Sequence, residues 1–199
     1  MVEIRKIGVI GAGQMGRGIA QVAAAAGFDV ALNDISQDRL DAALAFIGQN
    51  LDRQIEKGQT DAAGRAATLA RIRANVDLAA FGDCDLVIEA ASENEELKRK
   101  IFAAVIPHLR SDALLSSNTS SISITRLASS TDRPEQFIGI HFMNPVPRMQ
   151  LVELIRGIAT ADATFEGSRD FATKLGKTVT TSEDFPAFIV NRILLPMIN

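Results

Sequence analysis

Gly11-Ala12-Gly13-Gln14-Met15-Gly16 is a complete G-x-G-x-x-G pattern, and the residues on either side of it decide the fold. The short apolar run at residues 4–10 predicts a strand, and the alanine-rich stretch at 14–26 predicts a helix. A further apolar run, at 28–33, ends beside Asp34. Strand, glycine-rich turn, helix and second strand form the context in which this pattern binds a dinucleotide. An ordinary tight turn is the alternative interpretation of the glycines.

Each residue type in the pattern has a physical reason. Gly11 permits the tight turn, Gly13 lets the backbone approach a pyrophosphate, and Gly16 lets the helix pack on the strand. Gln14 and Met15 open the helix, whose free N–H groups and partial positive charge face the phosphates. We therefore predict that these residues bind the cofactor.

Asp34 predicts which dinucleotide binds. It ends the second strand, about 20 residues beyond the glycine turn, where an acidic side chain accepts hydrogen bonds from the adenosine ribose. The same carboxylate would repel a 2′-phosphate, so the sequence predicts NAD rather than NADP. A surface aspartate without this role is the alternative.

The rest of the chain alternates predicted helices with predicted strands. Ser36 is a candidate N-cap for a helix that continues through Ile55, and residues 60–73 predict a second helix that pairs with it as a hairpin. Further strands are expected at 85–90, 113–117, 137–142, 151–155 and 177–181, and further helices at 93–109, 122–128, 161–175 and 186–199. This alternation predicts an α/β fold: a Rossmann-type, doubly wound, mostly parallel sheet with a helical-hairpin insertion.

Composition and charge narrow the class of protein. The 199 residues are 47% hydrophobic and 23% charged, an ordinary globular composition. No apolar run approaches the roughly 18 residues that a membrane helix needs, and the net charge of −3 disfavours a nucleic-acid-binding surface. Cys84 is the single cysteine and no export signal is evident, so the sequence predicts a cytoplasmic protein. We expect no membrane, nucleic-acid or metal partner.

His141 and Glu153 are the candidate catalytic pair. His141 ends a predicted strand, where open α/β sheets place their chemistry, whereas His108 reads as a solvated residue at a helix end. Glu153 stands in an otherwise apolar run and needs a partner. The two positions are symmetric about Pro147, so a chain reversal there would bring them together, and Glu153 would then stabilise the imidazolium. A core histidine and a separate structural glutamate remain the alternative.

Further segments carry a resemblance to a known family. They are Gly11–Gly16, Val87-Ile88-Glu89-Ala90, Ser117-Asn118-Thr119-Ser120-Ser121, His141-Phe142-Met143-Asn144-Pro145 and Phe188-Ile189-Val190-Asn191-Arg192. Their order and content resemble the short-chain 3-hydroxyacyl-CoA dehydrogenases, and within them the bacterial enzymes for 3-hydroxybutyryl-CoA. The resemblance covers residues 4–199. It implies an NAD-dependent oxidoreductase of fatty-acid or butanoate metabolism that interconverts (S)-3-hydroxyacyl-CoA and 3-oxoacyl-CoA.

The resemblance also implies roles for single residues. His141 would be the general base and Glu153 its partner, while Ser120 and Asn191 would contact the reacting oxygen atoms of the substrate. From the residues alone, Ser120 could equally cap a helix, and Asn191 could be plain helix surface.

Other residues of the resemblance would bind cofactor and coenzyme A. Glu93, Lys98 and Asn118 would lie near the cofactor, and Lys57 near the coenzyme A part of the substrate. Solvated helix charges are the alternative for Glu93, Lys98 and Lys57. An acidic protein that binds an anionic thioester needs local cations, which favours Lys57.

The end of the chain departs from the family pattern. Ala187 stands where the family usually has glycine. The resemblance implies a cofactor domain at 1–184 and, at 185–199, the first helix of a helical domain that forms a homodimer and closes the substrate cleft, so we expect the chain to be truncated. Two rival functions stay open: a catalytically silent NAD-binding relative, and another Rossmann β-hydroxyacid dehydrogenase, although no matching lysine-base motif is evident.

Overall fold

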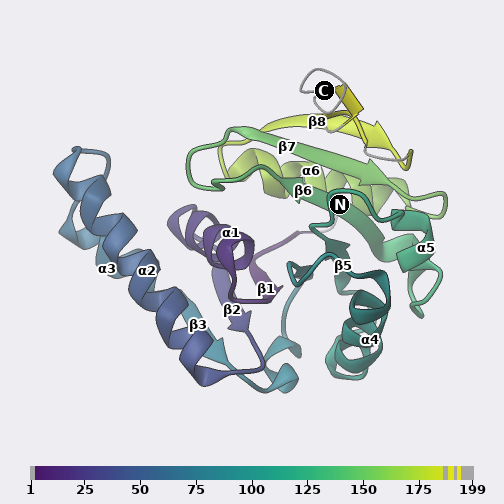
Figure 1. Ribbon diagram of the computed structural model, residues 1–199, viewed down its shortest axis with the longest axis horizontal. Coiled ribbons are helices and arrows are strands. Elements are labelled where there is room, and N and C mark those ends of the chain that lie inside the picture. Colours follow the sequence, from purple (N-terminus) through teal and green to yellow (C-terminus); the bar gives the residue numbers. More distant parts are fainter. Residues whose placement is uncertain (1–2, 186–187, 191, 194–199) are drawn as a thin grey trace.

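Eight strands form one sheet at the centre of the computed structural model, which describes residues 3–185, 188–190 and 192–193 (Figure 1). The strand order is β3-β2-β1-β4-β5-β6-β7-β8. The strands are β1 Lys6–Ile10, β2 Asp29–Asn33, β3 Ile72–Asn75, β4 Leu86–Glu89, β5 Leu114–Ser117, β6 Phe137–Phe142, β7 Leu151–Arg156 and β8 Thr178–Glu183. The helices are α1 Gln14–Ala25, α2 Gln37–Glu56, α3 Ala62–Ala70, α4 Glu95–Val105, α5 Ile124–Ala128 and α6 Asp162–Lys174.

The order of the strands places the candidate site. Strands β3, β2, β1, β4, β5 and β6 run parallel, so their carboxyl ends meet at one edge of the sheet. The chain builds outward from β1 in one direction and then, from β4, in the other. Ligands of open α/β sheets bind outside the carboxyl ends at such a switch point. The glycine-rich turn follows β1 at that point.

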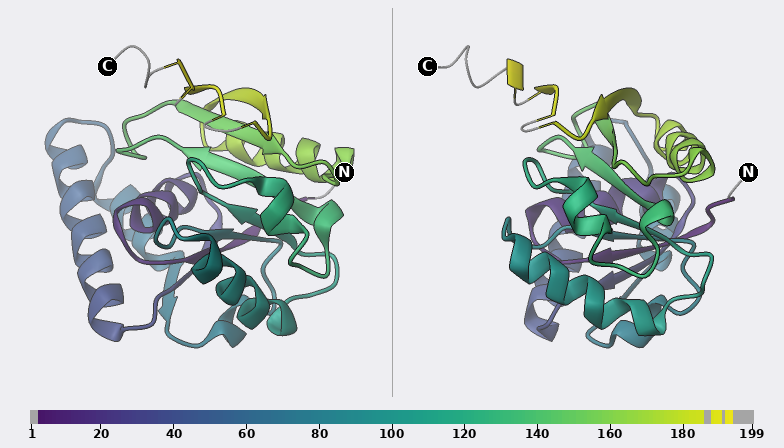
Figure 2. Two further views of the ribbon diagram at one scale, coloured as in Figure 1. Left: turned by 45° about the vertical axis from the view of Figure 1, so that its right-hand side comes forward. Right: turned by 90° about the vertical axis from the view of Figure 1, so that its right-hand side faces the viewer.

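The far side of the sheet changes direction. β7 pairs antiparallel with β6, and β8 pairs parallel with β7. Helices cover both faces of the sheet, and the views in Figure 2 show α6 and α4 on separate sides. β4, β5 and β6 are buried along their whole length, as strands covered on both faces must be. The predicted fold class is therefore confirmed.

The helical hairpin projects from the sheet, as α2 and α3 in Figure 1 show. Leu40, Ile47 and Leu51 of α2 are buried at successive spacings of seven and four residues, which matches one face of a helix. An ion pair between Arg65 Nε and Asp52 Oδ1, at 2.6 Å, joins the two helices.

Some predicted boundaries are wrong. Residues 60–73 do not form one helix, because α3 ends at Ala70 and β3 begins at Ile72. Ile72 pairs with Val30 and is buried against the sheet. This pairing is a tertiary contact, and the sequence of a four-residue edge strand is too short to predict it. Ser36 is the N-cap of α2 by position, but its side chain accepts no capping hydrogen bond, whereas Asp61 caps α3 through Gly64 N.

The two helices predicted at 93–109 and 186–199 have different outcomes. The helix expected at 93–109 ends at Val105, and Pro107 continues it as a 3₁₀ turn at Ile106–His108. Most of the helix expected at 186–199 lies outside the described residues. In the part of the chain that is described, no helix combines the length and apolar character needed to cross a membrane. Those same residues contain no histidine, cysteine, aspartate and glutamate cluster able to hold a metal ion.

Candidate active site

The glycine-rich loop is pinned between the ends of two strands. Gly11 has a φ of +101°, a left-handed conformation that favours glycine, and its N–H donates to Asn33 O at 2.8 Å. A Cβ on Gly11 would lie 2.8 Å from Ala90 O, at the end of β4. A Cβ on Gly16 would collide with Gly11 O, so both positions require glycine because the backbone approaches so closely.

Gly13 differs from Gly11 and Gly16, because no contact within the chain requires glycine there. A Cβ there would meet no protein atom within 4 Å, and its φ of −69° is open to any residue. Nothing inside the chain therefore excludes a side chain at Gly13. The residue is the N-cap of α1 and offers no side-chain cap to the free N–H groups of the first turn. An open, uncapped helix start fits the pyrophosphate of a dinucleotide.

Asp34 holds the glycine-rich loop, in addition to its predicted contact with the ribose. Its Oδ2 accepts a hydrogen bond from Ala12 N at 2.8 Å, and its side chain is 7% exposed. The other oxygen, Oδ1, lies 3.7 Å from Arg39 Nη1. Sequence reasoning missed Arg39, although its place five residues after Asp34, in the first turn of α2, is a signal that could have found it.

Replacing Asp34 by alanine is expected to weaken NADH binding by about 1.5–3 kcal/mol, the range for a hydrogen bond that involves a charged group. NADPH should lose less, because the repulsion of its 2′-phosphate disappears and Arg39 is released. Calorimetric titration of both cofactors measures this, with the exposed Asp38→Ala as the control. Equal losses for the two cofactors would contradict a ribose-reading role.

His141 and Glu153 lie directly opposite each other on β6 and β7. His141 Nδ1 is 2.7 Å from Glu153 Oε2, and Glu153 has no exposed surface. The second oxygen of Glu153 accepts hydrogen bonds from Ile189 N at 3.1 Å and Val190 N at 2.8 Å. Burial raises the pKa of the Glu153 carboxyl, but these hydrogen bonds and the one from His141 outweigh it, so the pKa lies below its ordinary value.

The chain reversal between the two strands connects this pair to the glycine-rich loop. Asn144 follows β6, and its Oδ1 accepts a hydrogen bond from Gln14 Nε2 at 2.9 Å. Lys177 Nζ donates to Val146 O at 2.7 Å and to Met149 O at 2.8 Å, which holds the reversal against the start of β8. Burial lowers the pKa of the Lys177 ammonium. Sequence reasoning missed Asn144 and Lys177 as site residues, although Asn144 lies within the segment that carries the resemblance.

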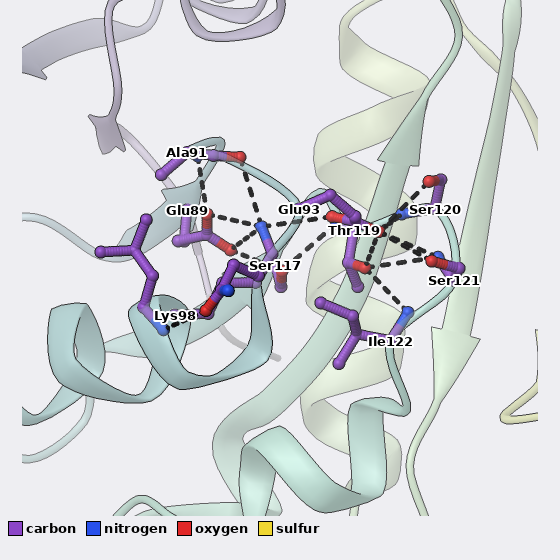
Figure 3. A network of polar contacts seen from close by, with 11 residues as sticks. Glu89, Ala91, Glu93, Lys98, Ser117, Thr119, Ser120, Ser121 and Ile122 are labelled. Atoms are coloured by element: carbon purple, nitrogen blue, oxygen red, sulfur yellow. Dashed lines mark hydrogen bonds and ion pairs between the residues drawn. The ribbon is translucent and has the colours of Figure 1, made fainter.

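Glu93 gathers the loop that carries Ser120 (Figure 3). Its Oε1 accepts from Thr119 Oγ1 at 2.5 Å, from Ser120 N at 2.9 Å and from Ser121 N at 3.2 Å. The hydroxyls of Ser120 and Ser121 lie at 3.2 and 3.1 Å from the same oxygen. Partial burial raises the pKa of the Glu93 carboxyl, but these hydrogen bonds and the charge of Lys98 outweigh it and leave the pKa lowered.

Lys98 is a buried residue. Its side chain is 1% exposed, and its ammonium lies 2.8 and 2.9 Å from the two oxygens of Glu89. The alternative of a solvated helix charge is therefore wrong for Lys98. Asn118 is nearly buried too, and its Oδ1 accepts from Phe142 N at 2.9 Å, joining the ends of β5 and β6.

Lys57 lies apart from the other candidate residues, at the end of α2. It lines a cavity of about 330 Å³ together with Arg53 and Arg148. A neighbouring cavity of about 250 Å³ is lined by Arg53, Arg148 and Arg17, and it reaches Asn144. No carboxylate in the described ranges forms an ion pair with these four cations. Sequence reasoning missed the three arginines, because α1, α2 and the reversal after β6 come together only in the folded chain.

Arg17 adds a second feature that favours the binding of an anion here. Its guanidinium carbon lies 3.5 Å from the ring centroid of Phe46, and its Nε is buried without a hydrogen-bond partner. An orphaned buried donor of this kind calls for an acceptor. Asn191, the remaining predicted site residue, lies outside the described residues, as does Ala187.

Comparison with known proteins gives consistent results. The family model described as "3-hydroxyacyl-CoA dehydrogenase, NAD binding domain" matches residues 6–185. A 3-hydroxybutyryl-CoA dehydrogenase of Bradyrhizobium diazoefficiens is 65% identical over 98% of this chain and 67% of its own length. A probable 3-hydroxybutyryl-CoA dehydrogenase of Deinococcus radiodurans is 52% identical over 98% of this chain and 69% of its own.

A solved structure agrees with these relatives. The (S)-3-hydroxybutyryl-CoA dehydrogenase from Ralstonia eutropha superposes with a TM-score of 0.97 at 46% identity, covering 99% of this chain and 70% of that one. The chain thus spans about two thirds of the length of the relatives that it matches. Sequence and fold point to one family.

Proposed function

Because this chain belongs to the NAD-binding 3-hydroxyacyl-CoA dehydrogenase family, we propose that it interconverts (S)-3-hydroxybutyryl-CoA and acetoacetyl-CoA, with His141 as the general base. The observation that carries the proposal is the contact between His141 and the fully buried Glu153 at the carboxyl edge of the sheet. The hydrogen bond from Gln14 to Asn144 links this pair to the glycine-rich loop, where the cofactor phosphates belong.

In this proposal the two ring nitrogens of His141 have different tasks. Glu153 accepts from Nδ1, so Nδ1 carries a proton and the lone pair of Nε2 is left to take the hydroxyl proton of the substrate. Bound NAD supplies the acceptor for the hydride, which leaves the carbon that bears this hydroxyl. Glu153 stabilises the imidazolium that results and keeps the ring oriented.

Ser120 and Asn191 complete the proposed substrate contacts. The backbone and hydroxyl of Ser120 are held by Glu93, which keeps the loop at the ends of β4 and β5. There its hydroxyl can meet the reacting oxygen of the substrate. Asn191 stays a prediction from the resemblance.

The coenzyme A part of the substrate is assigned to the basic cavities beside α2. Its phosphates are anionic, and Arg53, Lys57, Arg148 and Arg17 supply cations without carboxylate partners among the described residues. Arginine and lysine recognise phosphate through charge-assisted hydrogen bonds. The domain boundary near residue 184 and the homodimer likewise remain proposals.

Loss of NADH absorbance with acetoacetyl-CoA tests the proposal, with free acetoacetate as the control. We expect turnover of the thioester and little of the free acid, because the free acid lacks the nucleotide part. Preference for the free acid would favour another β-hydroxyacid dehydrogenase. NADH binding without any turnover of the thioester would favour a silent relative.

Neutralising two cavity cations in the double variant Lys57→Gln/Arg148→Gln should raise KM for acetoacetyl-CoA by about tenfold or more, as expected when two charge-assisted contacts are lost. NADH affinity should be unchanged. A short acetoacetyl thioester that lacks the nucleotide should be reduced equally well by the variant and the unaltered protein. The exposed Lys100→Gln on α4 is the matched control, and an equal rise in KM for the short thioester would contradict the assignment.

A further inference from the structure

Three buried polar side chains lie beneath the candidate site, and no role in the reaction has been given to two of them. Glu89 ends β4, Ser117 ends β5, and Lys98 comes from α4. Glu89 and Ser117 have no exposed surface and Lys98 has 1%. Figure 3 shows them meeting next to Glu93 and the Ser120 loop. Polar groups are expensive to bury, so a complete set of partners is expected.

The partners of Glu89 are complete. Its Oε2 accepts from Ser117 Oγ at 2.6 Å and from Lys98 Nζ at 2.9 Å. Its Oε1 accepts from Ala91 N at 2.6 Å and from Lys98 Nζ at 2.8 Å. Glu89 is thereby fixed by one side chain of the neighbouring strand and one backbone amide, and it fixes the Lys98 ammonium in turn.

The Lys98 ammonium is shared between two carboxylates. It lies 3.5 Å from Glu93 Oε2, a longer distance than the two it makes with Glu89. The other oxygen of Glu93 receives the hydrogen bonds of the Ser120 loop. A hold on Lys98 by Glu89 therefore leaves Glu93 turned toward the loop.

We propose that Glu89 and Ser117 are positioning residues that hold the loop at 119–122 and, with it, Ser120. Glu89 acts through Lys98 and Glu93. Ser117 acts through Glu89 and also directly, since its Oγ accepts a hydrogen bond from Thr119 N at 3.2 Å. The claim that this positioning affects the reaction rests on the proposed function, in which Ser120 contacts the substrate. The claim that Glu89 and Ser117 order the loop does not depend on that function.

Weakening Glu89 changes which carboxylate the Lys98 ammonium binds. A buried ammonium must keep an anionic partner, because an uncompensated charge in the interior is very costly. With Glu89 neutral, Lys98 turns to Glu93, the nearest remaining carboxylate. Glu93 then moves toward Lys98, and its hydrogen bonds to the Ser120 and Ser121 amides lengthen or break.

Two adjacent serines allow a matched experiment. Ser116 and Ser117 are both fully buried on β5, but Ser116 Oγ has no hydrogen-bond partner, whereas Ser117 Oγ bonds to Glu89. In Ser117→Ala and Glu89→Gln, we expect the amides of Ser120 and Ser121 to exchange hydrogen roughly tenfold faster or more, since each loses part of a charge-assisted hydrogen bond. Ser116→Ala should leave this exchange unchanged. Equal exchange in all variants would overturn the proposal.

A second variant separates positioning from stability, since Glu89→Gln leaves a buried ammonium and risks unfolding. The double variant Glu89→Gln/Lys98→Met replaces the ion pair by neutral groups of similar size, and such replacements often restore stability. We expect the loop amides to regain their protection whether or not Tm recovers fully, because no ammonium is left to draw Glu93 away from them. Loop amides that still exchange faster at a restored Tm would overturn an action through Lys98 and Glu93.

Measured turnover separates this inference from the proposed function. Reduced kcat for acetoacetyl-CoA in Ser117→Ala, with normal Tm and normal exchange outside the loop, supports both. If the unaltered protein shows no turnover but the loop exchange responds as expected, the proposed function is overturned and the positioning of the loop is supported. If turnover is normal in every variant while the loop loosens, the link from Glu89 to the reaction is overturned.

Discussion

Replacing His141 by alanine is expected to lower kcat for acetoacetyl-CoA by about 10²- to 10⁴-fold, the usual contribution of a positioned acid–base group. NADH affinity should stay near normal, because the cofactor loop is held by Ala12, Asn33 and Asp34 rather than by His141. Steady-state kinetics together with calorimetry measure the two quantities separately. A parallel loss of cofactor binding would show that His141 supports the fold rather than the reaction.

Glu153→Gln tests whether the pair acts as a unit. The variant keeps the shape of the side chain but loses the charge that supports an imidazolium, so kcat should fall by less than in His141→Ala. The double variant should be little worse than His141→Ala alone, because residues that act together are strongly non-additive. Additive losses would return Glu153 to a purely structural role.

The same glutamate should contribute to acid stability. Its folded-state pKa is lowered from the ordinary value of 4.5, so ionised Glu153 contributes stability that is present above this value and is lost as pH falls through the lower, folded pKa. Thermal unfolding measured between pH 7 and pH 3 should therefore show a shallower acid decline in Glu153→Gln. An unchanged slope would contradict the assignment.

Alanine at two glycines of the same loop should give opposite results. Gly13→Ala meets no protein atom, so Tm should be unchanged while NADH binding weakens by at least about 1.4 kcal/mol, a factor of ten. Gly16→Ala places a methyl group against Gly11 O, so unfolding should become easier by about 1–3 kcal/mol or more.

Calorimetry and thermal unfolding of the two glycine variants form a controlled pair. Each variant adds one methyl group to the same loop, so a general intolerance of alanine would affect both alike. Normal NADH affinity in Gly13→Ala would show that the phosphates do not approach this point of the loop.

Much of the fold follows from local pattern. The glycine-rich turn between an apolar strand and an alanine-rich helix, and the repeated alternation after it, placed the parallel strands to within one or two residues. β3 was missed because its four residues depend on pairing with Val30 and its neighbours on β2. Helix ends were misplaced where a cap or a proline decided them, as at Asp61 and Pro107.

By itself, the sequence determined the family and the dinucleotide-binding loop, because their motifs are made of residues close in the chain. It predicted that His141 and Glu153 meet, since they are symmetric about one reversal, but it left a separate structural glutamate open until the structure placed the two side chains 2.7 Å apart. Only the tertiary structure decided the rest. The burial of Lys98 between Glu89 and Glu93, and the gathering of Arg17, Arg53, Lys57 and Arg148 around two cavities, join elements distant in sequence. In the sequence, a charged helix residue that faces water cannot be distinguished from one that faces a buried carboxylate. The packing of the neighbouring element makes the difference, since the energy of a charge depends on what surrounds it.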